Sequence, residues 1–137
     1  CTPAGGTRTP LSAQVLAEGR HFAMMDGKAV FKFASSVVVK TVEAALAKLE
    51  LTVSDIRLFV PHQANQRITN LAAEKLKLRP DQVGANIERY GNTSAASIPL
   101  VLDEYKNQLQ SGDIVVQIGF GAGLTWGINI IRWGGRQ

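Results

Sequence analysis

Two polar residues, His62 and Asn92, have the types and settings that suit them to stabilising negative charge on an oxygen. His62 stands in the stretch VPHQAN at residues 60–65, and Asn92 follows thirty positions later in the stretch YGNTSAAS. Each comes where an extended segment meets a loop or a helix, so both side chains can converge on one point. A neutral imidazole and a side-chain amide are both uncharged groups that donate hydrogen bonds. Together they predict a site that holds an oxyanion.

The helix expected after His62 favours the neutral form of its ring, because a helix N-terminus carries partial positive charge that disfavours an imidazolium ion. Ligand sites of open α/β sheets also gather at the carboxyl ends of strands. Each residue taken alone has a simpler interpretation. A single histidine after a strand is more often structural, and a single asparagine such as Asn92 is better explained as a turn or helix cap.

A glycine-rich motif, GFGAG at residues 119–123, is similar to the start of a dinucleotide-binding loop. Such a loop needs a helix that opens at the glycines, whereas residues 124–133 continue as a β-rich run. A hairpin whose backbone closely approaches a substrate fits the pattern better, and a purely structural hairpin remains an alternative.

The sequence lacks the residues or motifs that other common catalytic sites require. Two histidines and one cysteine do not build an obvious zinc site, so no metal is expected. A triad of Ser94, His62 and Asp103 is not supported by any nucleophile-elbow motif. The second histidine, His21, lies in an irregular stretch and is expected at the surface.

The elements that must position these residues alternate between helical and extended patterns. Helical spacing of apolar residues predicts a helix over residues 29–49, whose first half is apolar almost all round and should be covered on several sides. A buried strand over residues 56–60 ends at Pro61, and a helix over residues 65–77 follows. His62 therefore lies between a strand and a helix.

Residues 83–87 form a weaker strand or extended candidate. Thr93 and Ser94 are expected caps for a helix over residues 98–109, with Pro99 in its first turns or at a kink. Two strands, over residues 114–120 and 124–133, surround the glycine tip. The order predicts a layered α/β fold, with a mixed β-sheet packed between helices. Residues 1–27 are expected to be irregular and residues 28–137 to form one half-domain.

Composition bounds the class of protein. The chain has 137 residues, 45% of them hydrophobic, and no apolar run long enough to span a membrane, so we expect a soluble protein. A net charge of +4 is mild, and the scattered basic residues predict no nucleic-acid surface. The single cysteine, Cys1, excludes an intrachain disulfide and suits a cytoplasmic location. The first residues look like a chain entered midway.

Three stretches of the chain are VPHQANQRI (60–68), ERYGNTSAASIP (88–99) and GFGAGLTWG (119–127). In this order they resemble the C-terminal half of β-ketoacyl-[acyl-carrier-protein] synthase III, a condensing-enzyme family with a thiolase-like fold. The resemblance runs from about Met25 to Trp133. It implies that a cysteine takes an acyl group from acyl-CoA and condenses it with malonyl-acyl-carrier protein after decarboxylation. It also implies a homodimer that initiates fatty-acid synthesis and needs no cofactor beyond these substrates.

The resemblance implies a role for each matching residue. His62 and Asn92 would bind the malonyl thioester oxygen and stabilise its enolate, and the backbone N–H of Ala122 would polarise the acyl-enzyme carbonyl. Acidic carrier protein would meet Lys32 and Arg67. Substrate-tunnel and active-site wall positions would be Gly27, Phe31, Ala64, Asn65, Arg67 and Phe120.

One departure from the family concerns the nucleophile. The family's catalytic cysteine lies in the N-terminal half, and Cys1 stands in a context unlike that motif. We therefore expect this chain to supply half of an active site, with the N-terminal half of the same enzyme as its partner, and to be inactive alone. Two alternatives stay open: a non-catalytic module that binds acyl-carrier protein, and a condensing enzyme of a polyketide or quinolone pathway.

Overall fold

The computed structural model describes residues 2–134, and the chain divides into two compact units between Lys32 and Phe33. The first unit contains the short helix α1 (Ala13–Ala17) and the beginning of α2 (Gly27–Lys48). Ser12 caps α1 by accepting a hydrogen bond from the N–H of Val15 at 3.2 Å. The sequence pattern predicts only irregular structure before residue 28. A helix of five residues is too short to show a period in the sequence.

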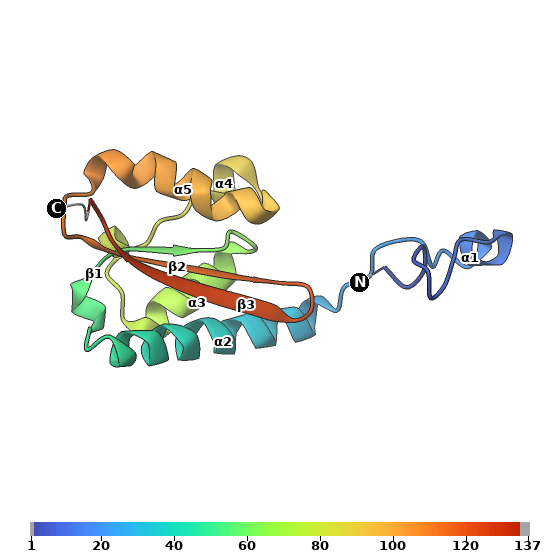
Figure 1. Cartoon of the computed structure of the whole chain (residues 1–137), viewed down its shortest axis with the longest axis horizontal. Coiled ribbons are helices and arrows are strands. Elements are labelled where there is room, and N and C mark those ends of the chain that lie inside the picture. The colour runs from blue at the N-terminus through green and yellow to red at the C-terminus, as the bar shows by residue number, and fades with distance from the viewer. Residues whose placement is uncertain (1, 135–137) are drawn as a thin grey trace. The chain divides into compact units, whose positions relative to one another are not determined.

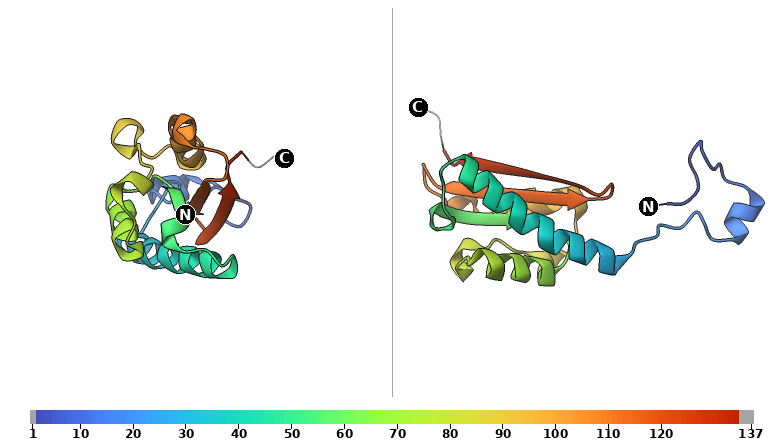
Figure 2. Two further views of the ribbon diagram at one scale, coloured as in Figure 1. Left: turned by 90° about the vertical axis from the view of Figure 1, so that its left-hand side faces the viewer. Right: turned by 90° about the horizontal axis from the view of Figure 1, so that it is seen from below.

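A three-stranded mixed sheet between helices forms the second unit, as the sequence predicted (Figure 1). Strand β1 (Ile56–Pro61) pairs in parallel with β2 (Ile114–Gly121), and β2 pairs antiparallel with β3 (Thr125–Arg132). One face is covered by α3 (Gln66–Leu76) and by the part of α2 after Lys32, and the other face by α5 (Ser97–Tyr105) (Figure 2).

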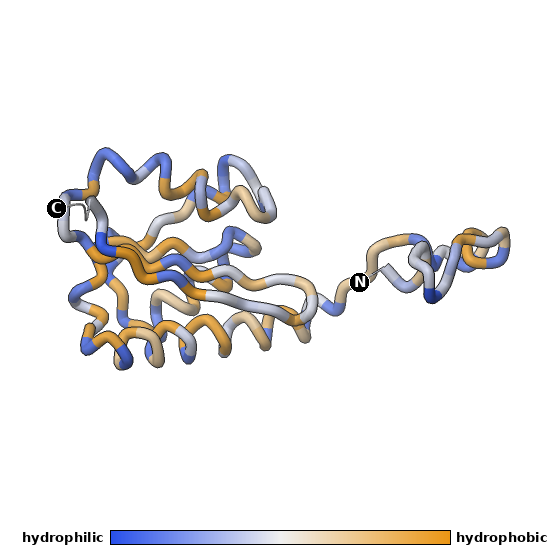
Figure 3. The backbone as a smooth tube through the Cα atoms, viewed as in Figure 1, coloured by the Kyte–Doolittle hydropathy of each residue, from blue (hydrophilic) through white to orange (hydrophobic). Residues whose placement is uncertain are grey.

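The core lies on both faces of β1 and β2, which explains why their sequences are mostly apolar and contain only Arg57 and Gln117 as charged or amide residues. Alternate residues of β2 point to opposite sides, so Val116 packs toward α2 and α3 while Val115 packs toward α5. In Figure 3 the strongly hydrophobic segments accordingly converge on the middle of this unit. The fully buried hydrophobic side chains of β1 and β2 are Ile56, Leu58, Phe59, Val60, Val115, Val116 and Ile118.

Helix α2 buries a single stripe within the described chain, although the sequence predicted cover on several sides. Ala34, Val38, Val42 and Leu46 recur every four residues and are buried, whereas most of the intervening residues are half-buried or exposed. The second unit presents only one layer to this helix, so only the stripe that faces the sheet is covered.

Helices α3 and α5 begin where the sequence placed them. Asn65 caps α3, and its Oδ1 accepts a hydrogen bond from the N–H of Arg67 at 2.9 Å. Pro99 is in the first turn of α5, as expected, but α5 ends at Tyr105 and a short 3-10 helix, η4 (Lys106–Gln108), follows it. The expected caps differ, since Thr93 precedes the 3-10 helix η3 (Ser94–Ala96) without a side-chain cap bond.

The segment after α3 runs beside β1 as an irregular partner of that strand. The 3-10 helix η2 (Pro80–Gln82) leads to Val83, which forms an isolated parallel bridge with Phe59. The N–H of Gly84 then donates to the carbonyl oxygen of Phe59 at 2.9 Å. The expected extended segment over residues 83–87 is therefore right at Val83 and wrong at its end, because the helix α4 (Ile87–Tyr90) begins there.

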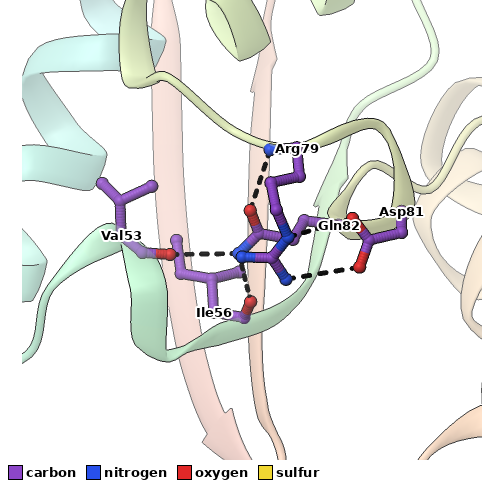
Figure 4. A network of polar contacts seen from close by, with 5 residues as sticks. All are labelled: Val53, Ile56, Arg79, Asp81 and Gln82. Carbon is purple, nitrogen blue, oxygen red and sulfur yellow. Dashed lines mark hydrogen bonds and ion pairs between the residues drawn. The ribbon is translucent and has the colours of Figure 1, made fainter.

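The buried side chain of Gln82 fastens this segment to the beginning of β1 (Figure 4). Its Nε2 donates to the carbonyl oxygens of Val53, in the 3-10 helix η1 (Val53–Asp55), at 3.1 Å and of Ile56 at 2.5 Å. Its Oε1 accepts from the N–H of Arg79 at 2.8 Å. One side chain thus bonds to three backbone groups and ties η1, the start of β1 and η2 together.

The close packing around Gly84 predicts that adding a side chain there would destabilise the fold. A Cβ atom there would lie 2.7 Å from Cγ1 of Val101 and 3.3 Å from Cδ1 of Leu58, which is closer than packed side chains allow. We expect Gly84→Ala to lower the free energy of unfolding by about 1–3 kcal/mol, measured by urea denaturation. Gly127→Ala is the matched control, because nothing lies within 4 Å of its Cβ position. Equal stability of the two variants would contradict the prediction.

Candidate active site

Both residues that the sequence singled out line one cavity of about 780 Å³ in the second unit. Three segments form it: the loop after β1, the loop that leads into α5, and the hairpin of β2 and β3. The side chains and backbone that line it belong to His62, Asn92, Ser94, Ala95, Ser97, Ile98, Gln117, Gly119, Phe120, Gly121, Thr125, Trp126, Gly127, Ile128 and Asn129. The predicted convergence of His62 and Asn92 on one place is therefore present.

His62 is held by its backbone and by its ring. The N–H of His62 donates to the carbonyl oxygen of Ile118 at 2.8 Å, which continues the pairing of β1 with β2. Its Nδ1 lies 2.6 Å from the Oγ of Ser97, and the ring of Phe120 packs edge-on against it, with centroids 5.3 Å apart. Within the described chain Nε2 has no protein partner, so it is the nitrogen left to meet a ligand.

Burial lowers the pKa of His62 below its ordinary value of 6.5, because the half-buried site disfavours the charged ring. The N-terminus of α3, which begins four residues later, acts in the same direction. His62 is therefore neutral at neutral pH and can donate one hydrogen bond without carrying a charge.

Asn92 serves as both a loop cap and a cavity residue. Its Oδ1 accepts a hydrogen bond from the N–H of Ser94 at 2.9 Å. In an amide side chain only the oxygen can accept a hydrogen bond, so this bond fixes which of the two end atoms of Asn92 is Oδ1 and which is Nδ2. The Nδ2 group, for which the described residues offer no acceptor, is left to donate. The turn-cap interpretation is thus correct, and it leaves the amide donors available.

Of two further residues predicted to belong to the site, one lines the cavity and the other does not. Phe120 lines the cavity, as expected for a wall residue. Ala122 is at the hairpin tip, where its carbonyl oxygen accepts from Oγ1 of Thr125 at 3.0 Å, but it does not line the cavity. The role of its N–H stays a prediction.

The positions expected along the substrate tunnel do not line this cavity either. Ala64, Asn65 and Arg67 occupy the turn and first residues of α3 that follow His62, where Asn65 and Arg67 are exposed. Gly27 and Phe31, expected along the tunnel, and Lys32, expected to meet carrier protein, belong to the first unit, and their roles remain predictions.

Two residues that the sequence analysis missed support the site. Ser97 lies in the small-residue run after Asn92, but no spacing rule distinguishes it from Ser94. Gln63 is fully buried; its Nε2 donates to the carbonyl oxygen of Pro61 at 2.7 Å and its Oε1 accepts from the N–H of Asn86 at 3.1 Å. Gln63 thereby ties the loop that carries His62 to the segment that leads to Asn92.

Two features are absent from residues 2–134. No group of three histidine, cysteine, aspartate or glutamate side chains is placed to hold a metal ion in this part of the chain. None of the helices described there is both long and apolar enough to cross a lipid bilayer.

The chain is similar to one family of known proteins. Residues 46–133 match the family described as 3-oxoacyl-[acyl-carrier-protein] synthase III, C terminal. The β-ketoacyl-[acyl-carrier-protein] synthase III of Symbiobacterium thermophilum is 49% identical over 135 residues, which cover 97% of this chain and 41% of the relative. That of Natranaerobius thermophilus is 46% identical, with 96% and 40% covered. The chain thus spans about 40% of the length of these relatives.

Solved structures agree with the predicted thiolase-like fold. The synthase III of Thermus thermophilus superposes with a TM-score of 0.79 at 50% identity, over 82% of this chain and 36% of that one. The priming β-ketosynthase of the R1128 polyketide biosynthetic pathway superposes with a TM-score of 0.77 at 38% identity, over 87% of this chain and 37% of that one.

Proposed function

Since this chain belongs to the 3-oxoacyl-[acyl-carrier-protein] synthase III family, we propose that it forms the part of the active site in which a malonyl thioester loses carbon dioxide. The observation that carries the proposal is that two side chains of one cavity each keep a polar atom that makes no hydrogen bond to the described protein. His62 and Asn92 each have one polar atom engaged by the protein, which leaves Nε2 and Nδ2 for a ligand.

These two donors suit the chemistry of decarboxylation. The bond from the malonyl carboxylate to the adjacent carbon breaks, carbon dioxide leaves, and the electron pair passes into the enolate of the thioester. Negative charge then develops on the thioester oxygen, chiefly in the transition state. Fixed donors at that oxygen lower the barrier because they do not need to reorganise as the charge forms.

The enolate carbon then attacks an acyl thioester and expels a cysteine thiolate, which forms the new carbon–carbon bond. We assign the cysteine to an N-terminal half of the same enzyme, since the sequence around Cys1, the one cysteine of this chain, is unlike the family's nucleophile motif. Cys1 itself lies outside the described residues. The backbone N–H of Ala122 is proposed to help polarise the acyl carbonyl. No cofactor is required, because the malonyl carboxylate leaves as carbon dioxide and drives the step.

The substrates and partners follow from family membership. We propose acyl-CoA as the acyl donor, malonyl-acyl-carrier protein as the extender and a homodimer as the working assembly. Lys32 and Arg67, both exposed, would meet the acidic carrier protein. The tunnel for the pantetheine arm would involve Gly27, Phe31, Ala64, Asn65 and Arg67.

The test is the His62→Ala variant of the enzyme that contains this chain. We expect the release of carbon dioxide from malonyl-acyl-carrier protein, measured without acyl-CoA, to fall about 10²-fold, as for loss of one donor to an oxyanion. His21→Gln is the matched control and should leave the rate unchanged, because His21 packs against Phe22 and has no proposed part in the chemistry. An unchanged rate in His62→Ala would refute the assignment and favour a non-catalytic carrier-binding module.

A polyketide priming role is the second candidate, because the R1128 priming ketosynthase shares the fold at 38% identity. Competition between fatty-acid and polyketide carrier proteins for the same malonyl group would separate the two. A higher kcat/KM with the fatty-acid carrier supports the first candidate, and the reverse preference supports the second.

A further inference from the structure

We propose that Ser97 is a positioning residue that holds His62 in one tautomer, with the ring hydrogen on Nε2 and directed into the cavity. The inference rests on the proposed role of His62 and goes beyond it by naming the group that prepares the imidazole as a donor.

The position of Ser97 is fixed by the fold. It is the first residue of α5 and only 1% exposed, and its N–H donates to the carbonyl oxygen of Ser94. One turn further on, Val101 anchors α5 in the core of the sheet. The Oγ of Ser97 therefore meets His62 from a rigid element, and their separation of 2.6 Å is that of a strong hydrogen bond.

The count of hydrogens around Ser97 determines the direction of that bond. The backbone N–H of Gln63 donates to Oγ at 3.3 Å and occupies one of its lone pairs. The hydroxyl hydrogen of a buried serine also needs an acceptor. Within residues 2–134, Nδ1 of His62 is the one acceptor found in reach of this oxygen. Ser97 therefore donates to Nδ1, and the hydrogen of the neutral ring must sit on Nε2.

Phe120 holds the ring from a second direction. Its ring packs against His62 at an interplanar angle of 74°, and it lines the same cavity. Between Ser97 and Phe120 the imidazole has little freedom to turn over, so Nε2 stays on the cavity side.

The tautomer matters because only N–H can stabilise a developing oxyanion. With the hydrogen on Nδ1, the ring would present the lone pair of Nε2 to the thioester oxygen and repel the charge that forms there. Loss of the Ser97 hydroxyl leaves both tautomers accessible, and the expected fall in decarboxylation is about tenfold, equivalent to one ordinary hydrogen bond.

The experiment uses the complete enzyme with ¹⁵N-labelled histidine. The His62 signals are identified by their loss in His62→Ala, and the nitrogen shifts report which ring atom carries the hydrogen. We expect Nε2–H alone in the natural enzyme, a mixture and about tenfold slower decarboxylation in Ser97→Ala, and recovery of both properties in Ser97→Thr, which keeps a hydroxyl. Ser36→Ala, an exposed serine of α2, should change neither.

A ring hydrogen on Nδ1 in the natural enzyme would overturn the proposal, even if no Ser97 variant folds. So would a pure Nε2–H tautomer in folded Ser97→Ala. Failure of the proposed function gives a different result, namely the Nε2–H tautomer together with undiminished decarboxylation in His62→Ala.

Discussion

Replacing Asn92 with aspartate should lower malonyl decarboxylation by at least about 10³-fold while leaving the loop folded. The carboxylate keeps an oxygen to accept the Ser94 N–H, so the cap at 2.9 Å can persist. The variant loses the Nδ2 donor and places a negative charge beside the oxygen on which the enolate charge develops. Loss of one donor typically costs about 10²-fold to 10³-fold, and like-charge repulsion adds to that cost.

The measurement is carbon dioxide release from malonyl-acyl-carrier protein by the complete enzyme, with far-UV circular dichroism to confirm folding. Asn70→Asp is the matched control, because Asn70 is exposed on α3 and its Oδ1 also accepts a hydrogen bond, from Gln66 at 2.8 Å. That variant makes the same chemical change and should retain the full rate. If Asn92→Asp decarboxylated as fast as Asn70→Asp, the amide of Asn92 would have no role as a donor.

The elements that carry the site could be predicted because each has a strong local signal. The apolar run of β1 ends at Pro61, and the helical spacing of α3 begins after Asn65, which has the side chain of a cap. His62 is fixed between these two boundaries. The hairpin strands were equally clear, since the glycine tip separates two β-rich runs.

The path from α3 to Asn92 could not be predicted, because distant groups determine it. Residues 83–87 look extended, but only Val83 pairs with β1, and the chain then turns into α4. Two buried glutamines hold this path in place. Gln82 bonds to the backbone at the start of β1, and Gln63, just beyond the end of β1, bonds to Asn86. Glutamine has no sequence pattern that marks it as a buried clamp, and three of its backbone partners here, Val53, Ile56 and Asn86, are distant in the sequence.

The contact of Ser97 with His62 was missed for a related reason. It joins residues 35 positions apart through one hydroxyl, in a run where Ser94 and Ser97 look alike. Only the orientation of α5 decides which serine faces the ring. The sequence therefore singled out His62 and Asn92, whereas the contacts that hold them became visible only in the structure.

Gln63→Leu should lower the free energy of unfolding by about 3 kcal/mol, measured by urea denaturation. Leucine fills a similar volume but leaves the carbonyl oxygen of Pro61 and the N–H of Asn86 buried without their partners at 2.7 and 3.1 Å. Each unsatisfied buried group costs about 1–3 kcal/mol, so the loss should exceed that of an ordinary surface substitution. Decarboxylation should fall as well, because the tie between the His62 loop and the segment leading to Asn92 is broken.

Gln66→Leu provides the comparison, since Gln66 makes one exposed hydrogen bond, to Asn70, and its loss should change stability by no more than about 0.5 kcal/mol. Gln63→Glu should be at least as unstable as Gln63→Leu near neutral pH, because a carboxylate at this fully buried position is costly and would place an oxygen against the carbonyl oxygen of Pro61. A Gln63→Leu protein as stable as Gln66→Leu would show that neighbouring groups or water replace both bonds, and that the spacing of His62 and Asn92 does not depend on this side chain.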